Sequence, residues 1–358
     1  MKAYSKSMVI IAAVLLIAAI PLFGGCNGGE VTPTPTPTPV VTEEPTAEPT
    51  AEPTAEPEVS EFEVVQDAVD TYLTSGSTWN IKASDLFMLI NDEEEDNDPY
   101  IISVRMAEDY AKGHIPGAIN IGFGDLFKTE TLATLPMDQQ IVIYCYTGHS
   151  GSHATAMLGA LGYDVVNLLH GMSAWTTDEE IAPYRFNPDT DRSDYAFETE
   201  ANEATETYSF PVLENTASTD EAEIVKAAAA SYASPKNITA SDLYLLLNDE
   251  EEDNDPFIVS VRGAEDYAKG HIPGAINIGL TTLAQNLDKL PPDEPIVVYC
   301  YTGHTGSQAT ALLNMLGYDA TNLRFGMVSW TQDTEVAPYA FDNSTVVDYA
   351  TVSGTSPM

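Results

Sequence analysis

Two cysteines, Cys145 and Cys300, each end a run of β-branched residues and begin nearly the same loop, Cys-Tyr-Thr-Gly-His-Ser/Thr-Gly-Ser. A helix-like segment follows each loop, and a helix N-terminus offers unpaired N–H groups and partial positive charge to an anion. The glycines allow the backbone conformations of an anion-holding nest. We therefore expect each sulfur to react as thiolate, the nucleophilic form, in its own recessed loop and without a disulfide between the two. The alternative is a buried, inert cysteine.

The loop residues after each cysteine are the candidates for holding a bound anion, through backbone N–H groups and through threonine and serine hydroxyls. They are Tyr146, Thr147, Gly148, His149, Ser150 and Gly151 in the first loop and Tyr301, Thr302, Gly303, His304, Thr305 and Gly306 in the second. A phosphatase or arsenate reductase would need an arginine six residues after the cysteine to grip a dianion. Gly151 and Gly306 occupy that position, which argues against those chemistries.

Several histidines near these loops invite a catalytic interpretation. His149 and His304 could assist the thiolate electrostatically or face solvent, and the sequence leaves both alternatives open. His153 is expected at the surface, because the corresponding position of the second loop is glutamine. His114 and His271 belong to Gly-His-Ile-Pro-Gly segments, for which we expect a structural role.

The loops must be positioned by a scaffold in which strands and helices alternate. We expect strands at residues 100–104, 118–121, 141–145 and 165–169, and a helix at 152–161. The second copy repeats this pattern, with strands expected at residues 258–261, 276–278 and 296–300 and a helix at 308–316. Such alternation predicts an α/β fold with a parallel sheet covered by helices on both faces, which binds ligands at the carboxyl ends of its strands.

The chain contains two copies of one sequence repeat. Residues 91–99 recur as 248–256, and residues 107–122 recur as 264–279. This period is too long for a solenoid and indicates two duplicated domains. The predicted boundaries are 61–185 and 223–350 for the domains, with lead-in helices at 62–74 and 223–233, an acidic linker at 186–222 and a tail at 351–358.

The first segment of the chain is predicted to be an export signal. Residues 1–26 join two lysines to an apolar run that ends before Cys26, and they resemble the lipobox of prokaryotic lipoproteins. The resemblance implies that Cys26 carries a lipid, which would anchor the exported protein to the outer face of the cytoplasmic membrane or to the cell envelope. Residues 27–60 are rich in Thr, Pro and Glu and are expected to form an extended linker.

The charge of the chain excludes some partners. Fourteen Lys and Arg against 55 Asp and Glu give a net charge of −41, which argues against nucleic-acid binding. The acidic run at residues 91–99 lacks the ligand spacing of an EF-hand, so a solvated loop is expected and no metal or other cofactor is predicted. Arg105 and Arg262 are expected to pair with acids such as Glu108 and Glu265.

The motifs together resemble the rhodanese (sulfurtransferase) family. In the first copy they are Ser-Val-Arg at 103–105, Gly-His-Ile-Pro-Gly-Ala-Ile-Asn at 113–120, the Cys145 loop and Gly-Met-Ser-Ala-Trp at 171–175. The second copy carries their counterparts around Cys300. The resemblance implies two tandem rhodanese-like domains, each a doubly wound five-stranded parallel sheet. It also implies that both cysteines carry sulfur as a persulfide, which the loop amides and hydroxyls hold.

The family resemblance implies an enzyme that moves sulfane sulfur. The donor would be thiosulfate or a persulfide, and the acceptor would be cyanide or a thiol. Two other functions stay open at this point, namely a persulfide carrier without turnover and a structural surface lipoprotein. The sequence names no protein partner, and the membrane would be reached only through the N-terminal lipid.

Overall fold

The structure is a computed structural model that describes residues 60–76, 79–249, 251 and 254–355. The predicted signal segment, Cys26 and the linker up to residue 59 lie outside these residues. Within the described part of the chain, no helix has the length and apolar character needed to cross a membrane. Both repeats fall within one contact unit, which spans residues 56–358.

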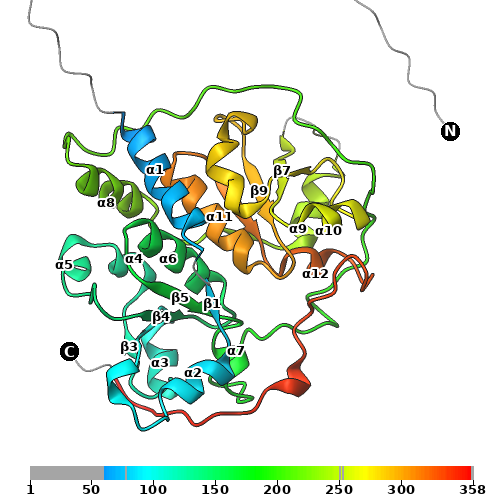
Figure 1. Cartoon of the computed structure of the whole chain (residues 1–358). Helices are drawn as coiled ribbons and strands as arrows, with labels where there is room; N and C mark the ends of the chain where they lie inside the picture. The colour runs from blue at the N-terminus through cyan, green and yellow to red at the C-terminus, as the bar shows by residue number, and fades with distance from the viewer. Residues whose placement is uncertain (1–59, 77–78, 250, 252–253, 356–358) are drawn as a thin grey trace, which may run out of the picture. The chain divides into compact units, whose positions relative to one another are not determined.

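Each repeat contains a five-stranded parallel sheet, as predicted (Figure 1). The strand order is β1-β5-β4-β2-β3 in the first sheet and β6-β10-β9-β7-β8 in the second. The first sheet consists of β1 (Asn80–Ile81), β2 (Tyr100–Ser103), β3 (Ile119–Asn120), β4 (Ile141–Tyr144) and β5 (Val165–Leu168). The second consists of β6 (Asn237–Ile238), β7 (Phe257–Ser260), β8 (Ile276–Asn277), β9 (Ile296–Tyr299) and β10 (Ala320–Leu323). Every residue of the central strands β4 and β9 is buried, which fits their composition of Ile and Val with one Tyr at the end of each.

Helices cover both faces of each sheet. The first repeat contains α2 (Ala83–Leu89), η1 (Glu95–Asn97), α3 (Ala107–Lys112), α4 (Phe123–Leu126), α5 (Thr129–Leu132), α6 (His149–Ala160) and α7 (Met172–Trp175). The second contains α9 (Ala240–Leu246), α10 (Ala264–Lys269), η3 (Leu280–Gln285), η4 (Leu287–Lys289), α11 (His304–Met315), α12 (Gly326–Trp330) and η5 (Asn343–Thr345). The two lead-in helices are α1 (Glu61–Thr74) and α8 (Glu221–Ser231).

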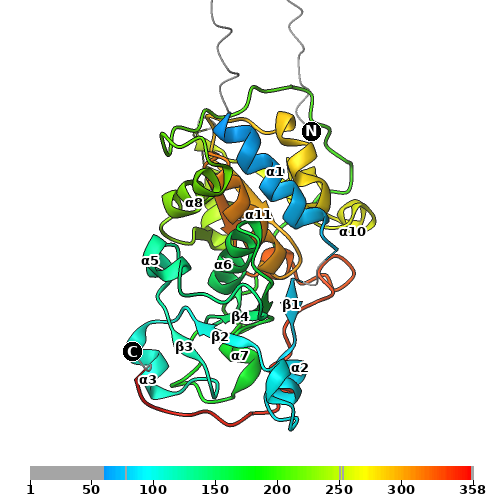
Figure 2. The same cartoon turned by 60° about the vertical axis from the view of Figure 1, so that its left-hand side comes forward.

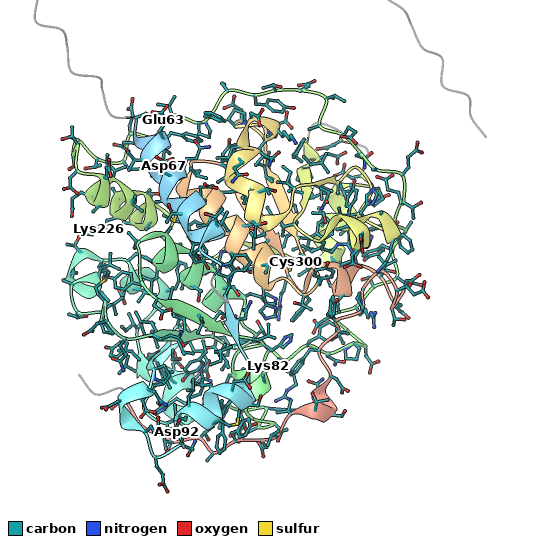
Figure 3. The ribbon with its side chains drawn as sticks, viewed as in Figure 1. Glu63, Asp67, Lys82, Asp92, Lys226 and Cys300 are labelled. Atoms are coloured by element: carbon teal, nitrogen blue, oxygen red, sulfur yellow. The ribbon has the colours of Figure 1, made fainter. Side chains whose placement is uncertain are left out.

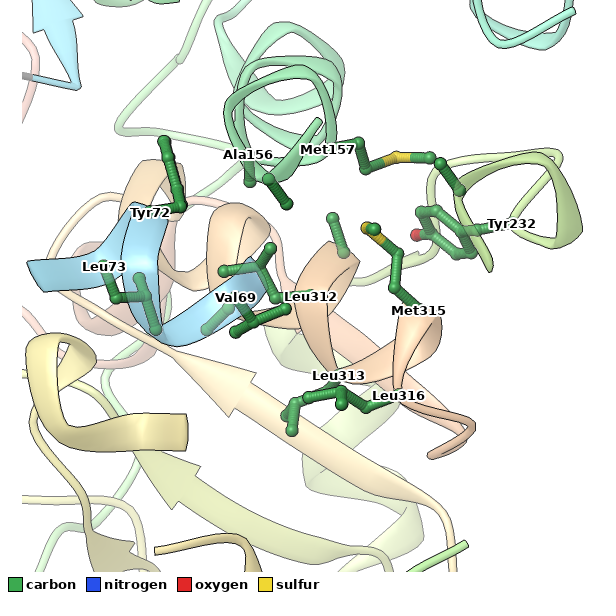
Figure 4. Packing of buried hydrophobic residues seen from close by; sticks show 14 of the residues in the cluster. Val69, Tyr72, Leu73, Ala156, Met157, Tyr232, Leu312, Leu313, Met315 and Leu316 are labelled. Carbon is green, nitrogen blue, oxygen red and sulfur yellow. The ribbon is translucent and has the colours of Figure 1, made fainter. Parts of the chain in front are cut away.

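The two repeats share a hydrophobic core. Helices α6 and α11 lie side by side between the sheets in both views (Figures 1 and 2). Ala156 and Met157 of α6 and Leu312 and Met315 of α11 belong to one buried cluster, which Val69 of α1 completes (Figure 4). This cluster extends from the first repeat to the second without interruption, so the halves are fused through their apolar faces.

The lead-in helices pack across the repeat boundary. Helix α1 precedes the first repeat, yet Gln66 donates a hydrogen bond of 2.7 Å to the carbonyl oxygen of Ala284 in the second. Tyr232, which ends α8 before the second repeat, places its ring edge-on to Phe123 of the first. Its hydroxyl lies 3.2 Å from Nδ1 of His153.

The segment that follows each repeat also packs against the other repeat. Trp175 of the first repeat donates to the carbonyl oxygen of Ala350, which follows the second repeat. Trp330 of the second repeat donates over 2.9 Å to the carbonyl oxygen of Ala196, which follows the first. Antiparallel bridges strengthen both contacts, with His114 opposite Val352 in one case and Glu198 opposite His271 in the other. Each repeat is therefore covered in part by the segment that follows the other repeat.

Two expectations about side chains are wrong. His153 is fully buried rather than at the surface, because the end of α8 covers it. Arg105 and Arg262 do not pair with Glu108 and Glu265. Both guanidinium groups are buried and donate to main-chain carbonyls instead: Arg105 to those of Ile181, Asp109 and Gly113, and Arg262 to those of Val336 and Gly270.

Candidate active site

Each cysteine lies at the carboxyl end of the central strand, at the entry to a long helix. Strand β4 ends at Tyr144 and α6 begins at His149, so Cys145 opens a loop of four residues between them. Gly148 ends this loop with φ of 87°, in the left-handed region that favours glycine. The helix begins earlier than the sequence predicted, since this turn lets His149 start it.

The sulfur of each cysteine accepts a hydrogen bond from the backbone. The N–H of Gly148 lies 3.1 Å from Cys145 Sγ, and the N–H of Gly303 lies 3.1 Å from Cys300 Sγ. Both cysteines are free thiols, with exposed fractions of only 3% and 1%. Cys300, labelled in Figure 3, opens the loop that leads into α11. The sequence predicts several loop amides around each sulfur, and the structure shows one amide hydrogen bond to each.

A second glycine brings the backbone of α7 close to the first loop. The N–H of Met172 donates over 2.9 Å to the carbonyl oxygen of Cys145. Gly171 has φ of 54°, and a Cβ atom there would lie 2.5 Å from that same oxygen. Gly326 has the corresponding position beside Cys300. These glycines are required both by the backbone conformation and by the lack of space.

The tyrosine after each cysteine fixes the loop to a neighbouring helix. Tyr146 donates over 2.6 Å to the Asp109 carboxylate of α3, and Tyr301 donates over 2.6 Å to Asp266 of α10. Burial, followed by the aspartate contact, raises the pKa of Tyr301 to about 12. Both tyrosines are therefore neutral hydrogen-bond donors at physiological pH.

The remaining predicted loop residues have distinct environments. Gly151 and Gly306 pack against the side-chain amides of Asn167 and Asn322, where a Cβ atom would collide. Ser150, in the first turn of α6, is half-buried, as is Thr305 in α11. The role of their hydroxyls in holding a persulfide stays a prediction.

His149 and His304 lie buried at the junction of the two repeats, which excludes the alternative that they face solvent. Their rings stack with centroids 5.1 Å apart. The Nδ1 atom of each lies 2.9 Å from the hydroxyl of its own loop threonine, Thr147 or Thr302. Burial lowers the pKa of His304 to about 4, and burial together with the neighbouring His304 lowers that of His149 well below its ordinary range. Both imidazoles are therefore neutral at physiological pH.

One further loop contact could not have been predicted from the sequence. The backbone N–H of His170 lies 3.2 Å from Nε2 of His304 in the other repeat. His170 itself has φ of 62° and precedes Gly171. His114 and His271 are buried and stack on Tyr110 and Tyr267, which fits the structural role expected for them. Among the described residues, no group of three or more His, Cys, Asp or Glu could hold a metal ion.

Comparisons with known proteins concern the two repeats. The rhodanese-like domain family matches residues 87–178 and 239–333. The putative sulfurtransferase YtwF of Bacillus subtilis is 37% identical over 82 residues, which cover 23% of this chain and 78% of that protein. A sulfurtransferase of Allochromatium vinosum is 32% identical over 79 residues, covering 22% of this chain and 74% of that protein. The crystal structure of a rhodanese-like domain protein from Staphylococcus aureus is 32% identical, covers 26% of this chain and 90% of its own, and has a TM-score of 0.25.

Proposed function

The chain belongs to the rhodanese-like family, and from this premise we propose that it is a sulfurtransferase with two active cysteines, Cys145 and Cys300. The observation that carries the proposal is the amide hydrogen bond to each sulfur at a helix entrance. Such a donor stabilises negative charge on the cysteine sulfur and so favours the thiolate. The names of the relatives, sulfurtransferases among them, favour the same chemistry.

The proposed cycle has two steps. The thiolate attacks the outer sulfur of thiosulfate, a new S–S bond forms, and sulfite leaves with the electrons of the bond that breaks. Cyanide or a thiolate then attacks the outer sulfur of the persulfide, and the cysteine thiolate is released. No external oxidant or reductant is needed, because the sulfur carries its oxidation state from donor to acceptor. The sulfur that the main-chain amide contacts is the one that would become the inner sulfur of the persulfide.

Activity in both repeats is part of the proposal. Each loop has a cysteine at the strand end, a left-handed glycine and an amide donor at the same distance. The sequence differs between the loops only where Ser150 is replaced by Thr305. Both residues offer a hydroxyl, so we propose the same chemistry for each.

The test is thiocyanate formation from thiosulfate and cyanide. The wild-type chain and each single variant, Cys145→Ser and Cys300→Ser, should turn over, and the double variant should be inactive. Turnover by the double variant would contradict the proposal. Persulfide formation without thiocyanate would favour a carrier, and thiols that resist mild alkylation at neutral pH would favour a structural lipoprotein.

We also propose that the protein is exported and anchored by a lipid on Cys26, which rests on residues 1–26 of the sequence alone. The test is incorporation of a labelled fatty acid by a bacterial host that expresses the full chain. Label should appear on the wild-type protein and be absent from Cys26→Ser. Equal labelling of both, or none in either, would contradict the anchor but leave the catalytic proposal unaffected.

A further inference from the structure

The two cysteine loops meet at the junction between the repeats, and each contacts a histidine of the other repeat. His304 Nε2 lies 3.1 Å from the carbonyl oxygen of Thr147. His149 Nε2 lies 3.0 Å from the carbonyl oxygen of Thr302. The contact is therefore reciprocal, and it relates residues that are more than 150 positions apart.

The carbonyl that each histidine touches belongs to the peptide group whose N–H contacts the opposite sulfur. The oxygen of Thr147 and the N–H of Gly148 are the two ends of one planar peptide bond. That N–H donates to Cys145 Sγ over 3.1 Å. The second loop repeats the arrangement around Cys300. One peptide group thus lies between an imidazole on one side and a catalytic sulfur on the other.

A hydrogen bond to the oxygen of a peptide group has two consequences for its N–H. It polarises the group, so that the N–H donates more strongly to a negatively charged sulfur. It also fixes the plane of the peptide. Gly148 has φ of 87° and no Cβ, so its own side chain does not hinder a rotation that would turn the N–H away from Cys145.

The fit between each imidazole and the opposite loop is close. A Cβ atom at Gly148 would lie 2.6 Å from His304 Nε2, and one at Gly303 would lie 2.6 Å from His149 Nε2. Because a neutral imidazole has one N–H, the hydroxyl of Thr302 can donate to His304 Nδ1 and leave the proton on Nε2. In that tautomer Nε2 donates to the Thr147 carbonyl. The N–H of His170, 3.2 Å from the same nitrogen, donates to it only in the other tautomer, in which Nδ1–H donates to Thr302 and the Thr147 carbonyl loses its imidazole donor.

We infer that His149 and His304 are positioning residues that act across the repeats, each holding the peptide group that donates to the catalytic sulfur of the other. His304 serves Cys145, and His149 serves Cys300. The inference rests on the proposed role of both cysteines as nucleophiles, but thiol reactivity tests it without any sulfur donor. Loss of this coupling and loss of sulfur transfer are therefore separate outcomes.

The experiment measures alkylation by iodoacetamide at neutral pH, with peptide mass spectrometry to follow each cysteine separately from Cys26. In a Cys300→Ser chain, His304→Phe keeps a buried ring but removes the N–H donor. We expect alkylation of Cys145 to slow by about threefold to tenfold, the effect of one lost hydrogen bond. His149→Phe in the same chain removes a contact with the Thr147 hydroxyl but not the donor to the Thr147 carbonyl, so it should slow Cys145 less than His304→Phe does.

The ranking should reverse in a Cys145→Ser chain, where His149→Phe should slow alkylation of Cys300 more than His304→Phe does. A purely local role predicts the opposite, namely that each histidine affects the cysteine of its own loop. That result, or equal effects on both cysteines, would overturn the inference.

A pair of amide variants keeps the test decisive if the phenylalanine variants fold poorly. His304→Gln can place an N–H near the Thr147 carbonyl, whereas the shorter His304→Asn places its amide nearer Thr302. Gln should restore most of the Cys145 reactivity, and Asn should not. Equal reactivity of the two variants would contradict a role for the Nε2 donor.

Discussion

The indole Nε1 of Trp175 donates a hydrogen bond of 3.0 Å to the carbonyl oxygen of Ala350, a residue 175 positions later in the chain. This bond closes the C-terminal segment over the first repeat, although that segment leaves the second. Tyr349 adds a stacked contact with Phe87 at a centroid distance of 4.4 Å. Together with helices α1 and α8, the C-terminal segment makes the stability of each repeat depend on contacts with segments that adjoin the other repeat.

Removal of residues 347–358 should therefore destabilise the first repeat. The deletion breaks the Trp175 bond, the bridge between His114 and Val352 and the aromatic contacts of Tyr349. We expect the free energy of unfolding to fall by about 2–4 kcal/mol, measured by urea denaturation. A chain that ends at Thr355 keeps these contacts and should match the wild type. Equal stability of the two truncated chains would contradict the exchange.

Cleavage of the connection between the repeats should not separate them. A protease site placed at residues 203–207 lies in a largely exposed stretch. Because α6, α11 and the exchanged segments still hold the halves together, the cut protein should elute as one species in gel filtration. Leu312→Asp would bury an unpaired charge in the shared core and should release the fragments from the cut chain. Separation without that substitution would show that the halves associate weakly.

Gly171→Ala should slow alkylation of Cys145, an effect that backbone strain at position 171 alone would not produce. The new Cβ would lie 2.5 Å from the Cys145 carbonyl oxygen, so the loop must shift. Gly162→Ala is the matched control, because φ there is 90° but no atom lies within 4 Å of the added Cβ. The control should cost about 1–2 kcal/mol by unfolding and leave alkylation of Cys145 unchanged. Gly171→Ala should also slow that alkylation, and similar behaviour of the two variants would contradict the close approach.

Acid should destabilise the fold through its buried histidines. Burial lowers the pKa of His153 to about 3, from an ordinary value of 6.5. The unfolded chain therefore binds this proton at a higher pH than the folded one, so the stabilisation is complete above pH 6.5 and declines toward pH 3. The contribution approaches about 1.4 kcal/mol per pH unit for one such group. His153→Gln, which installs the residue of the second repeat, should reduce the slope of unfolding free energy between about pH 6.5 and 5. An unchanged slope would show that His153 takes up its proton as readily in the folded chain as in the unfolded one.

The sequence was sufficient for the sheets and the cysteine loops, and insufficient for the contacts between repeats. Cys145 could be placed at a strand end because the β-branched run and the glycine loop are local signals. The exchange of α1 and α8 leaves no such signal, because nearly identical repeats do not reveal which copy a segment packs against. His153 was misplaced because glutamine at the corresponding position suggested a surface site, whereas Gln308 is itself fully buried. The residue that contacts the His153 ring is Tyr232, which leads into the other repeat. The pairing of Arg105 failed because main-chain carbonyls, which any sequence provides, take the place of Glu108.

The most direct test of the account is the intact mass of the protein after treatment with thiosulfate and then with cyanide. Wild-type protein should gain the mass of two sulfur atoms, on Cys145 and Cys300, and cyanide should remove both as thiocyanate. Each single Cys→Ser variant should gain one sulfur. Failure of either cysteine to take up sulfur, under conditions where it is alkylated normally, would contradict the claim that both loops carry out sulfur transfer.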